Sequence, residues 1–195
     1  MTALRTFVAV PLPETLRAEL LATATALAVE LPGVKWTRKI ENLHVTIKFL
    51  GKVAEDRLSE VGSALVRAVS GLPRFEAEVR GLGAFPSARR ASVIWAGIEA
   101  RGGELGRIAE AVEAMAAGLG VGEREDRPFR GHITVGRAPK RDDVDARAVL
   151  APLADRSFGR VAVEELHLYE SQLGHGPDNA GSTYVLRQTA ALASN

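Results

Sequence analysis

The chain has 195 residues, of which 46% are hydrophobic, and its 25 basic residues nearly balance its 24 acidic ones. This length suits one domain or two closely packed lobes, and the charge balance does not predict long-range attraction to a polyanion. Cysteine is absent, which excludes disulfides, thiolate nucleophiles and cysteine-based metal sites. The sequence has no apolar stretch suited to a signal peptide or a membrane helix, so we expect a cytoplasmic protein that does not bind membranes.

The first part of the chain alternates predicted strands and helices. Short β-branched runs predict strands, and apolar residues at helical spacing predict helices. In chain order we expect a strand at 6–10, a helix at 14–31, an extended segment at 34–36, a strand at 43–50 ended by Gly51, a helix at 58–69 and a strand at 75–79 followed by a glycine-rich turn.

The second part repeats a similar order of elements. We expect a strand at 92–98, a helix at 105–119, a strand at 131–135, a helix at 144–153 after the Asp142-Asp143 pair, and strands at 161–169 and 183–188. Glycines end the helix near residue 119, as is typical of helix C-termini.

One four-residue phrase occurs twice, as His44-Val45-Thr46-Ile47 and as His132-Ile133-Thr134-Val135. Side chains two residues apart in a strand point to the same face, so each phrase presents an imidazole and a hydroxyl together. Strict alternation places Lys48 on the same face as His44 and Thr46, with Phe49 on the opposite, apolar face. A single His-x-Thr would most often be a cross-strand pair, but two copies in matching places indicate function.

Each copy is preceded and followed by a predicted helix, which indicates an internal duplication. We therefore predict an α+β protein with a bilobal duplicated fold: two mostly antiparallel sheets with outer helices, and a central cleft carrying both motifs. Residues 1–195 would form one bilobal domain with pseudo-repeats at roughly 1–90 and 91–195, and strands could exchange between the lobes.

Two imidazoles that face each other supply a proton donor and a proton acceptor near neutral pH. The sequence has no spacing typical of a metal site, no Gly-x-Ser-x-Gly elbow and no phosphate-binding Gly-x-x-x-x-Gly-Lys-Ser/Thr loop. What remains is in-line displacement at a phosphodiester, with neither metal nor other cofactor, in which Thr46 and Thr134 hold the nonbridging oxygens.

Other residues near the motifs are weaker candidates. Arg137 would bind the phosphate if the strand bulges or ends at Gly136, whereas strict alternation points it away. Arg130 lies two residues before the second His and would meet the substrate or remain solvated. Trp36 and Phe85 would stack a base at the cleft mouth or simply pack.

The remaining two histidines are expected to have no catalytic role. His167 lies within a predicted strand and is expected to be structural or at the surface, and His175 lies in a glycine-flanked loop and is expected to be solvated.

The chain resembles the two-histidine (2H) phosphoesterase superfamily, in its bacterial and archaeal RNA 2′,3′-cyclic phosphodiesterase branch, once described as 2′-5′ RNA ligases. The resemblance covers nearly the whole chain. Besides His132–Arg137, it is carried by Arg5–Val10, Val34–Trp36, Asn42–Gly51, Gly83–Ser87, Val93–Trp95 and Leu168–Ser171. Family members often have Pro directly before the second His, where this chain has Gly131.

The resemblance implies metal-independent hydrolysis of a 2′,3′-cyclic phosphate to a 2′-phosphomonoester. His44 would protonate the departing O3′, His132 would activate the attacking water, and Thr46 and Thr134 would hold the phosphate. The substrates would be RNA 3′ ends or small cyclic nucleotides, and nothing demands an obligate protein partner or more than a monomer.

Three alternatives share the same residues. The first is a sibling activity, namely 2′-5′ RNA ligation or cleavage of another cyclic phosphate. The second is trimming of RNA 3′ ends, which the weak net charge disfavours. The third is an RNA-end-binding module without turnover, which the presence of both His and both Thr disfavours.

Overall fold

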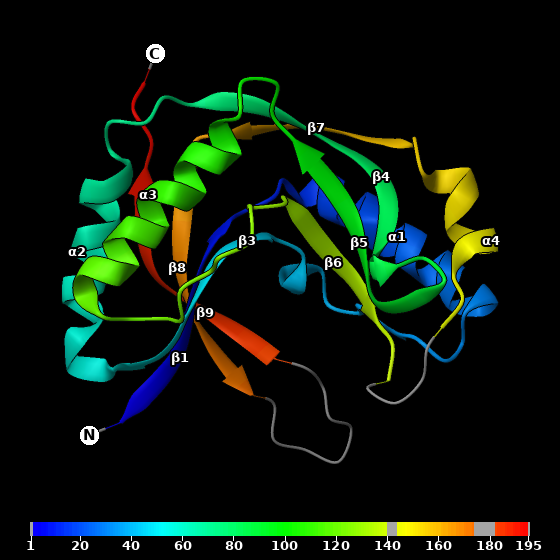
Figure 1. Cartoon of the computed structure of the whole chain (residues 1–195), viewed down its shortest axis with the longest axis horizontal. Coiled ribbons are helices and arrows are strands. Elements are labelled where there is room, and N and C mark those ends of the chain that lie inside the picture. The colour runs from blue at the N-terminus through cyan, green and yellow to red at the C-terminus, as the bar shows by residue number, and fades with distance from the viewer. Residues whose placement is uncertain (1, 140–143, 174–181, 195) are drawn as a thin grey trace.

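The computed structural model describes residues 2–139, 144–173 and 182–194. Strands and helices are mixed along the chain, as Figure 1 shows. The elements are β1 (Ala3–Val10), α1 (Glu14–Glu30), β2 (Lys35–Trp36), β3 (Val45–Ala54), α2 (Leu58–Val69), β4 (Phe75–Ser87), β5 (Arg90–Glu99), α3 (Glu104–Leu119), β6 (His132–Arg137), α4 (Arg147–Leu150), β7 (Ser157–Val163), β8 (Glu165–Leu173) and β9 (Ser182–Ala191).

The strands form two antiparallel sheets. The first sheet has the order β3-β1-β8-β9, and the second has the order β2-β6-β5-β4-β7. The first sheet takes strands from both ends of the chain, because β8 and β9 complete the sheet begun by β1 and β3. The predicted α+β class with two antiparallel sheets is confirmed.

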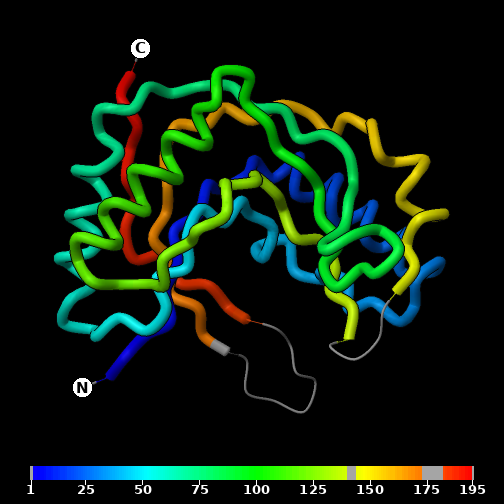
Figure 2. Tube along the Cα trace, viewed as in Figure 1, coloured from blue at the N-terminus to red at the C-terminus, as the bar shows by residue number. Residues whose placement is uncertain are grey.

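The helices lie on the outer faces of the sheets. In the first sheet α2 contacts β9 and α3 contacts β3, whereas α1 contacts β6 and β7 of the second sheet. The two sheets curve into an open arch with the helices around its outside (Figure 2). We call the faces that carry no helix the inner faces. No helix within the described ranges is long and apolar enough to cross a membrane.

The core is built by residues that face the helices. Val8 and Leu168 of the first sheet and Ile94 and Ile133 of the second are fully buried. Burying such a side chain contributes about 1.5–3 kcal/mol relative to leaving it in water. Both motif strands are therefore held by the apolar positions between their polar ones.

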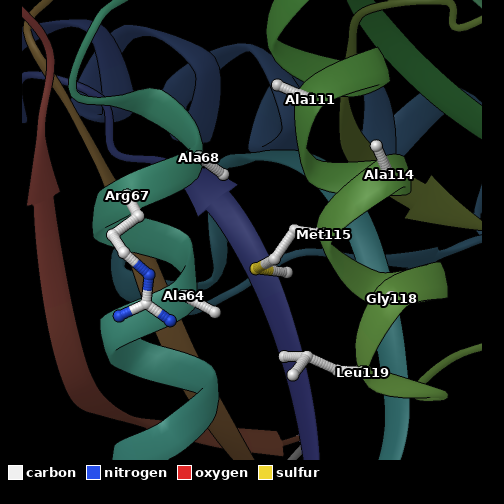
Figure 3. A pocket seen from close by; sticks show the side chains of 8 residues that line it. All are labelled: Ala64, Arg67, Ala68, Ala111, Ala114, Met115, Gly118 and Leu119. Carbon is white, nitrogen blue, oxygen red and sulfur yellow. The ribbon is translucent and has the colours of Figure 1, made fainter.

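The outer helices α2 and α3 pack through small residues. Ala64 and Ala68 face Ala111 and Ala114 across a groove of about 500 Å³, with Arg67, Met115, Gly118 and Leu119 completing its lining (Figure 3). Small side chains allow the two helices to approach closely. The groove contains no residue of either His-x-Thr motif.

Two strands are longer than the sequence predicts. β3 does not end at Gly51 but continues to Ala54, because Gly51 takes a left-handed φ of 69° where the pairing with β1 shifts register. β4 likewise continues through its glycines to Ser87. Gly83 is needed there because a Cβ atom would lie 2.4 Å from the ring of Trp95.

Two other predicted elements differ from the structure. The predicted strand at 161–169 is divided at Glu164 into β7 and β8, which belong to different sheets. The predicted helix at 144–153 is limited to α4 and a 3-10 turn at Ala151–Leu153, which contains the Pro152 that breaks the pattern.

Candidate active site

The two motifs lie on strands that contact each other across the two sheets. His44 directly precedes β3, the edge strand of the first sheet, whereas His132 opens β6 in the second sheet. β3 and β6 are in contact. The fold therefore brings the two copies of the phrase to neighbouring strands, although they are far apart in the sequence.

A β-bulge follows the Thr of each motif. In the pairing of β1 with β3, Val8 is opposite Lys48 and Ala9 is opposite Thr46, which leaves Ile47 without an opposite residue. Each bulge adds one residue to its strand and so reverses the alternation beyond it.

The second motif has the same feature. Gly136 is opposite Ile94 and Thr134 is opposite Trp95, so Val135 has no opposite residue. The duplication extends to this irregularity.

Because of the first bulge, Lys48 and Phe49 face the opposite sides of the sheet from those that the sequence predicts. Lys48 is only 7% exposed and faces α3, whereas Phe49 is 64% exposed. Strict alternation predicts the opposite arrangement for both residues. The extra residue at Ile47 turns Phe49 to the inner face that also carries Thr46, so sequence reasoning missed Phe49 as a site residue.

The second bulge decides the direction of Arg137. Its side chain is exposed, and its positive charge partly offsets the burial that raises the pKa of Tyr184, a residue of the first sheet. The extra residue at Val135, and not at Gly136, turns Arg137 to the face that carries Thr134, while its contact with a phosphate stays a prediction. It forms no ion pair with a carboxylate in the described part of the chain.

His44 lies in a box of aromatic rings on the inner face of the first sheet. Phe7 stacks on the imidazole at 4.9 Å between ring centroids, Tyr184 meets it edge-on at 5.2 Å, and Tyr169 lies 6.3 Å away. The chain has two tyrosines, and both belong to this box. Neither is among the site residues predicted from the sequence, because only the pairing of strands distant in the sequence brings them to His44.

The box determines the charge of His44 in the unliganded protein. Burial lowers the pKa of His44 from 6.5 to about 4, so the imidazole is neutral at pH 7. Burial also raises the pKa of Tyr169 and Tyr184, which keeps both phenols protonated.

A hydrogen-bonded row runs along β8 beside this box. His167 Nε2 lies 2.7 Å from Glu165 Oε1, and its Nδ1 lies 2.8 Å from Tyr169 Oη. An ionised carboxylate only accepts, so Nε2 carries the hydrogen and Tyr169 donates its hydroxyl to Nδ1. His167 is thus half-buried and structural, while the other predicted non-catalytic histidine, His175, lies outside the described residues.

His132 is oriented by the backbone two residues before it. Its Nδ1 lies 2.8 Å from the carbonyl oxygen of Arg130, which can only accept a hydrogen bond. Nδ1 therefore carries the hydrogen in the neutral ring, and Nε2 keeps its lone pair. That is the tautomer a proton acceptor requires.

Phe85 and Arg130 pack beside His132. Phe85 meets the imidazole edge-on at 5.1 Å, and the Arg130 guanidinium lies 5.8 Å from the centre of the Phe85 ring. With Trp95 and Phe129 they line a hollow of about 340 Å³ next to His132. Arg130 has no carboxylate partner among the residues that the structure describes.

Trp36 does not belong to this group. It is 7% exposed, packs in the core near Gly136, and donates its indole N–H to the Leu31 carbonyl. A Cβ on Gly136 would lie 2.9 Å from the Trp36 ring, so only glycine leaves room for that ring at this position. Of the two roles that the sequence allows for Trp36, the structure shows packing in the core.

The chain matches a known family over most of its length. The family model of LigT-like phosphoesterases matches residues 10–95 and 98–177. That match includes both His-x-Thr motifs.

The chain belongs to the LigT-like phosphoesterase family.

Relatives in the family carry a more specific name. The RNA 2′,3′-cyclic phosphodiesterase of Archaeoglobus fulgidus is 33% identical over 87% of this chain and 92% of its own length. The Aeropyrum pernix protein of the same name is 36% identical over 68% of this chain and 74% of its own.

Solved structures share the fold. A crystal structure of a Thermus thermophilus protein matches with a TM-score of 0.77 at 29% identity, covering 96% of this chain and 97% of its own. Escherichia coli LigT with 3′-AMP matches with a TM-score of 0.73 at 24% identity over 97% of this chain and 98% of its own, which shows the fold alone.

Proposed function

We propose that this chain hydrolyses RNA 2′,3′-cyclic phosphate termini to 2′-phosphomonoesters by acid–base catalysis with His44 and His132. The observation that carries the proposal is the doubled His-x-Thr phrase, each copy followed by a bulge, on two strands in contact. Family membership and the names of the relatives support the same reaction.

His132 is the proton acceptor. The bond from Nδ1–H to the Arg130 carbonyl leaves the Nε2 lone pair for a water molecule. As the water oxygen attacks phosphorus, its proton passes to Nε2. The bond from phosphorus to O3′ breaks, which leaves the phosphate on O2′.

His44 is the proton donor to the departing O3′. Its neutral state in the unliganded protein means that it must gain a proton before the reaction. A phosphodiester anion within hydrogen-bond distance favours the imidazolium, and the Phe7 face stacked on the ring favours a cation as well. Binding of the substrate anion therefore favours protonation of His44, which makes the imidazolium available as the general acid.

The phosphate is held between the two sheets. Thr46 and Thr134 donate hydroxyl hydrogen bonds to its nonbridging oxygens, and Arg137 adds a charged donor. Because Arg137 has no carboxylate partner in the described segments, its charge remains available to the phosphate. These donors stabilise the negative charge that develops on the phosphorus oxygens in the transition state.

The substrate is an RNA 3′ end or a small cyclic nucleotide. Exposed Phe49 offers a ring to a base beside His44, and Arg130 with Phe85 borders the site beside His132. The proposal requires no metal ion, because the two imidazoles make both proton transfers. In the described ranges no three His, Cys, Asp or Glu side chains gather as a metal site would require.

The test is to incubate the protein, in excess chelator, with an oligonucleotide that ends in a 2′,3′-cyclic phosphate. We expect complete turnover to the 2′-phosphate isomer, identified by phosphorus NMR. Formation of the 3′-phosphate, or loss of activity that a divalent ion restores, would contradict the proposal.

A further inference from the structure

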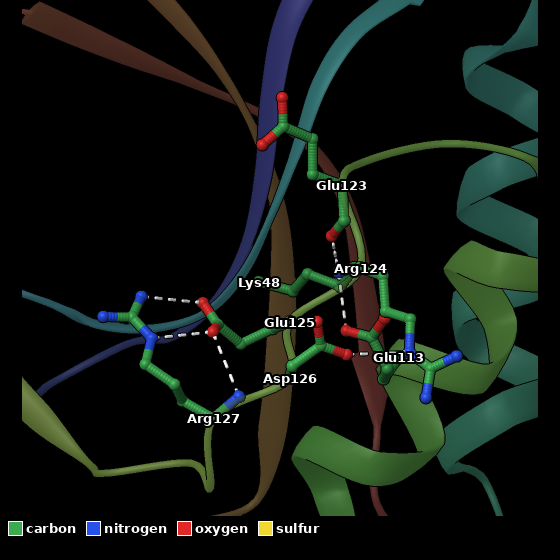
Figure 4. Close-up of polar contacts among 7 residues, drawn as sticks. All are labelled: Lys48, Glu113, Glu123, Arg124, Glu125, Asp126 and Arg127. Carbon is green, nitrogen blue, oxygen red and sulfur yellow. Dashed lines mark hydrogen bonds and ion pairs between the residues drawn. The ribbon is translucent and has the colours of Figure 1, made fainter.

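Lys48 is a buried cation whose donors point away from the substrate side. Its Nζ lies 2.6 Å from Glu113 Oε2 on α3 and 2.8 Å from the carbonyl oxygen of Glu123 (Figure 4). A buried ammonium group is tolerated where its hydrogens are bonded, and a carboxylate partner offsets its loss of water. The bulge at Ile47 is what turns Lys48 to this side.

The Glu123 carbonyl belongs to the segment that joins α3 to β6. This segment, residues 120–131, crosses β3 at the position of Lys48. Gly122 takes a φ of 74°, and a Cβ there would lie 2.8 Å from the Phe49 carbonyl oxygen. The crossing therefore touches the first motif strand directly.

The same segment ends at the second motif. It supplies Arg130, whose carbonyl fixes the tautomer of His132. The ion pairs that Arg124 and Arg127 form with Asp126 and Glu125 are exposed and lie within the segment (Figure 4). These pairs therefore do not attach the segment to β3.

We propose that Lys48 is a positioning residue that sets the two halves of the active site relative to each other. This role rests on the proposed function. By binding Glu113 and the Glu123 carbonyl together, Lys48 holds the crossing segment against β3. The segment then delivers the Arg130 carbonyl at the place where it orients His132 toward a phosphate held beside His44.

A purely structural ion pair would behave differently. It would contribute to the free energy of unfolding and leave the folded enzyme unchanged at low temperature. A positioning residue lowers kcat in a protein that remains folded, because a displacement of about 1 Å at the reacting groups costs about 10²-fold in rate.

The experiment compares Lys48→Met with Lys52→Met, which removes an exposed lysine from the same strand. We expect Lys48→Met to lower kcat by about 10²-fold and to shift the imidazole NMR signals of unliganded His132. Lys52→Met should match the wild type in both measurements. A folded Lys48→Met protein with wild-type kcat and wild-type His132 signals would overturn the proposal.

A milder variant covers the case in which Lys48→Met does not fold. Glu113→Gln keeps an oxygen acceptor for Lys48 but removes the carboxylate charge, so we expect a lower thermal stability and a fall in kcat of about tenfold at a temperature where the variant is fully folded. Wild-type kcat in Glu113→Gln would then overturn the proposal. If the wild type itself fails to turn over the cyclic phosphate, the proposed function fails, while the His132 signals still test the role of Lys48.

Discussion

At the scale of single residues, the two histidines share a sequence phrase but not an environment. His44 is enclosed by Phe7 and two tyrosines, whereas His132 is held by the Arg130 carbonyl beside Phe85. The proposed mechanism has the enclosed imidazole gain its proton as the substrate anion binds, whereas the carbonyl-bound imidazole offers a lone pair to the attacking water. In the proposed mechanism, these different surroundings suit the two identical side chains to opposite tasks.

The low pKa of His44 predicts how stability changes with pH. Between about pH 6.5 and pH 4 the unfolded chain binds a proton at this residue and the folded protein does not, so stability falls as the pH falls. The full effect is about 3 kcal/mol and is complete below pH 4. Denaturant unfolding at a series of pH values measures it.

The matched variant is His44→Gln, which cannot titrate. Its unfolding free energy should fall less than that of the wild type over the same pH range. Parallel pH dependence in the two proteins would show that His44 is not the group responsible.

At the scale of elements, the repeated bulge is the feature that builds the site. It places Phe49 and Arg137 at the same spacing after the two histidines and turns both away from the core. Alternation alone predicts the core side for Phe49 and points Arg137 away from the face that carries His132 and Thr134. An extra residue in a strand has no composition signal of its own, so only the observed pairing identifies it.

Exposed Phe49 predicts a contribution to nucleotide binding. Phe49→Ala should raise KM for a 2′,3′-cyclic nucleotide by about tenfold, since stacking of a base on an aromatic ring contributes about 1–3 kcal/mol. The KM for a ribose cyclic phosphate without a base should stay the same. Steady-state kinetics with both substrates make the comparison.

Val29→Ala is the control, because Val29 is an exposed apolar residue on α1. It should leave both KM values unchanged. An equal rise in KM for the two substrates in Phe49→Ala would mean that the ring shapes the phosphate site and does not stack a base.

At the scale of the whole molecule, the sequence predicts the order of the helices and strands better than it predicts which strands pair with each other. Hydrophobic periodicity reveals the three long helices, the motif strands and the α+β class. It cannot reveal that Glu164 separates strands of different sheets, because strand-like patterns lie on both sides of it and together predict one continuous strand. The aromatic box could not be predicted for the same reason, since Phe7, Tyr169 and Tyr184 come together only through the pairing of β1, β8 and β9.

The sequence likewise predicts the motif residues of the candidate site better than the residues that position them. His44, Thr46, His132 and Thr134 stand out because their pattern occurs twice. Lys48 carries no such signal, since its burial depends on a bulge and on a distant helix. The role of Trp36 stays open in the sequence because an aromatic residue near a motif looks the same whether it packs in the core or binds a base.

The central claim is that both imidazoles act on one phosphate, and the most direct measurement is kcat for His44→Ala and His132→Ala on a 2′,3′-cyclic phosphate substrate. Each variant, with folding verified by circular dichroism, should lose a factor of about 10² to 10⁴, the usual size of a general acid or base contribution. Near wild-type turnover in both folded variants would contradict the claim and make the doubled motif structural.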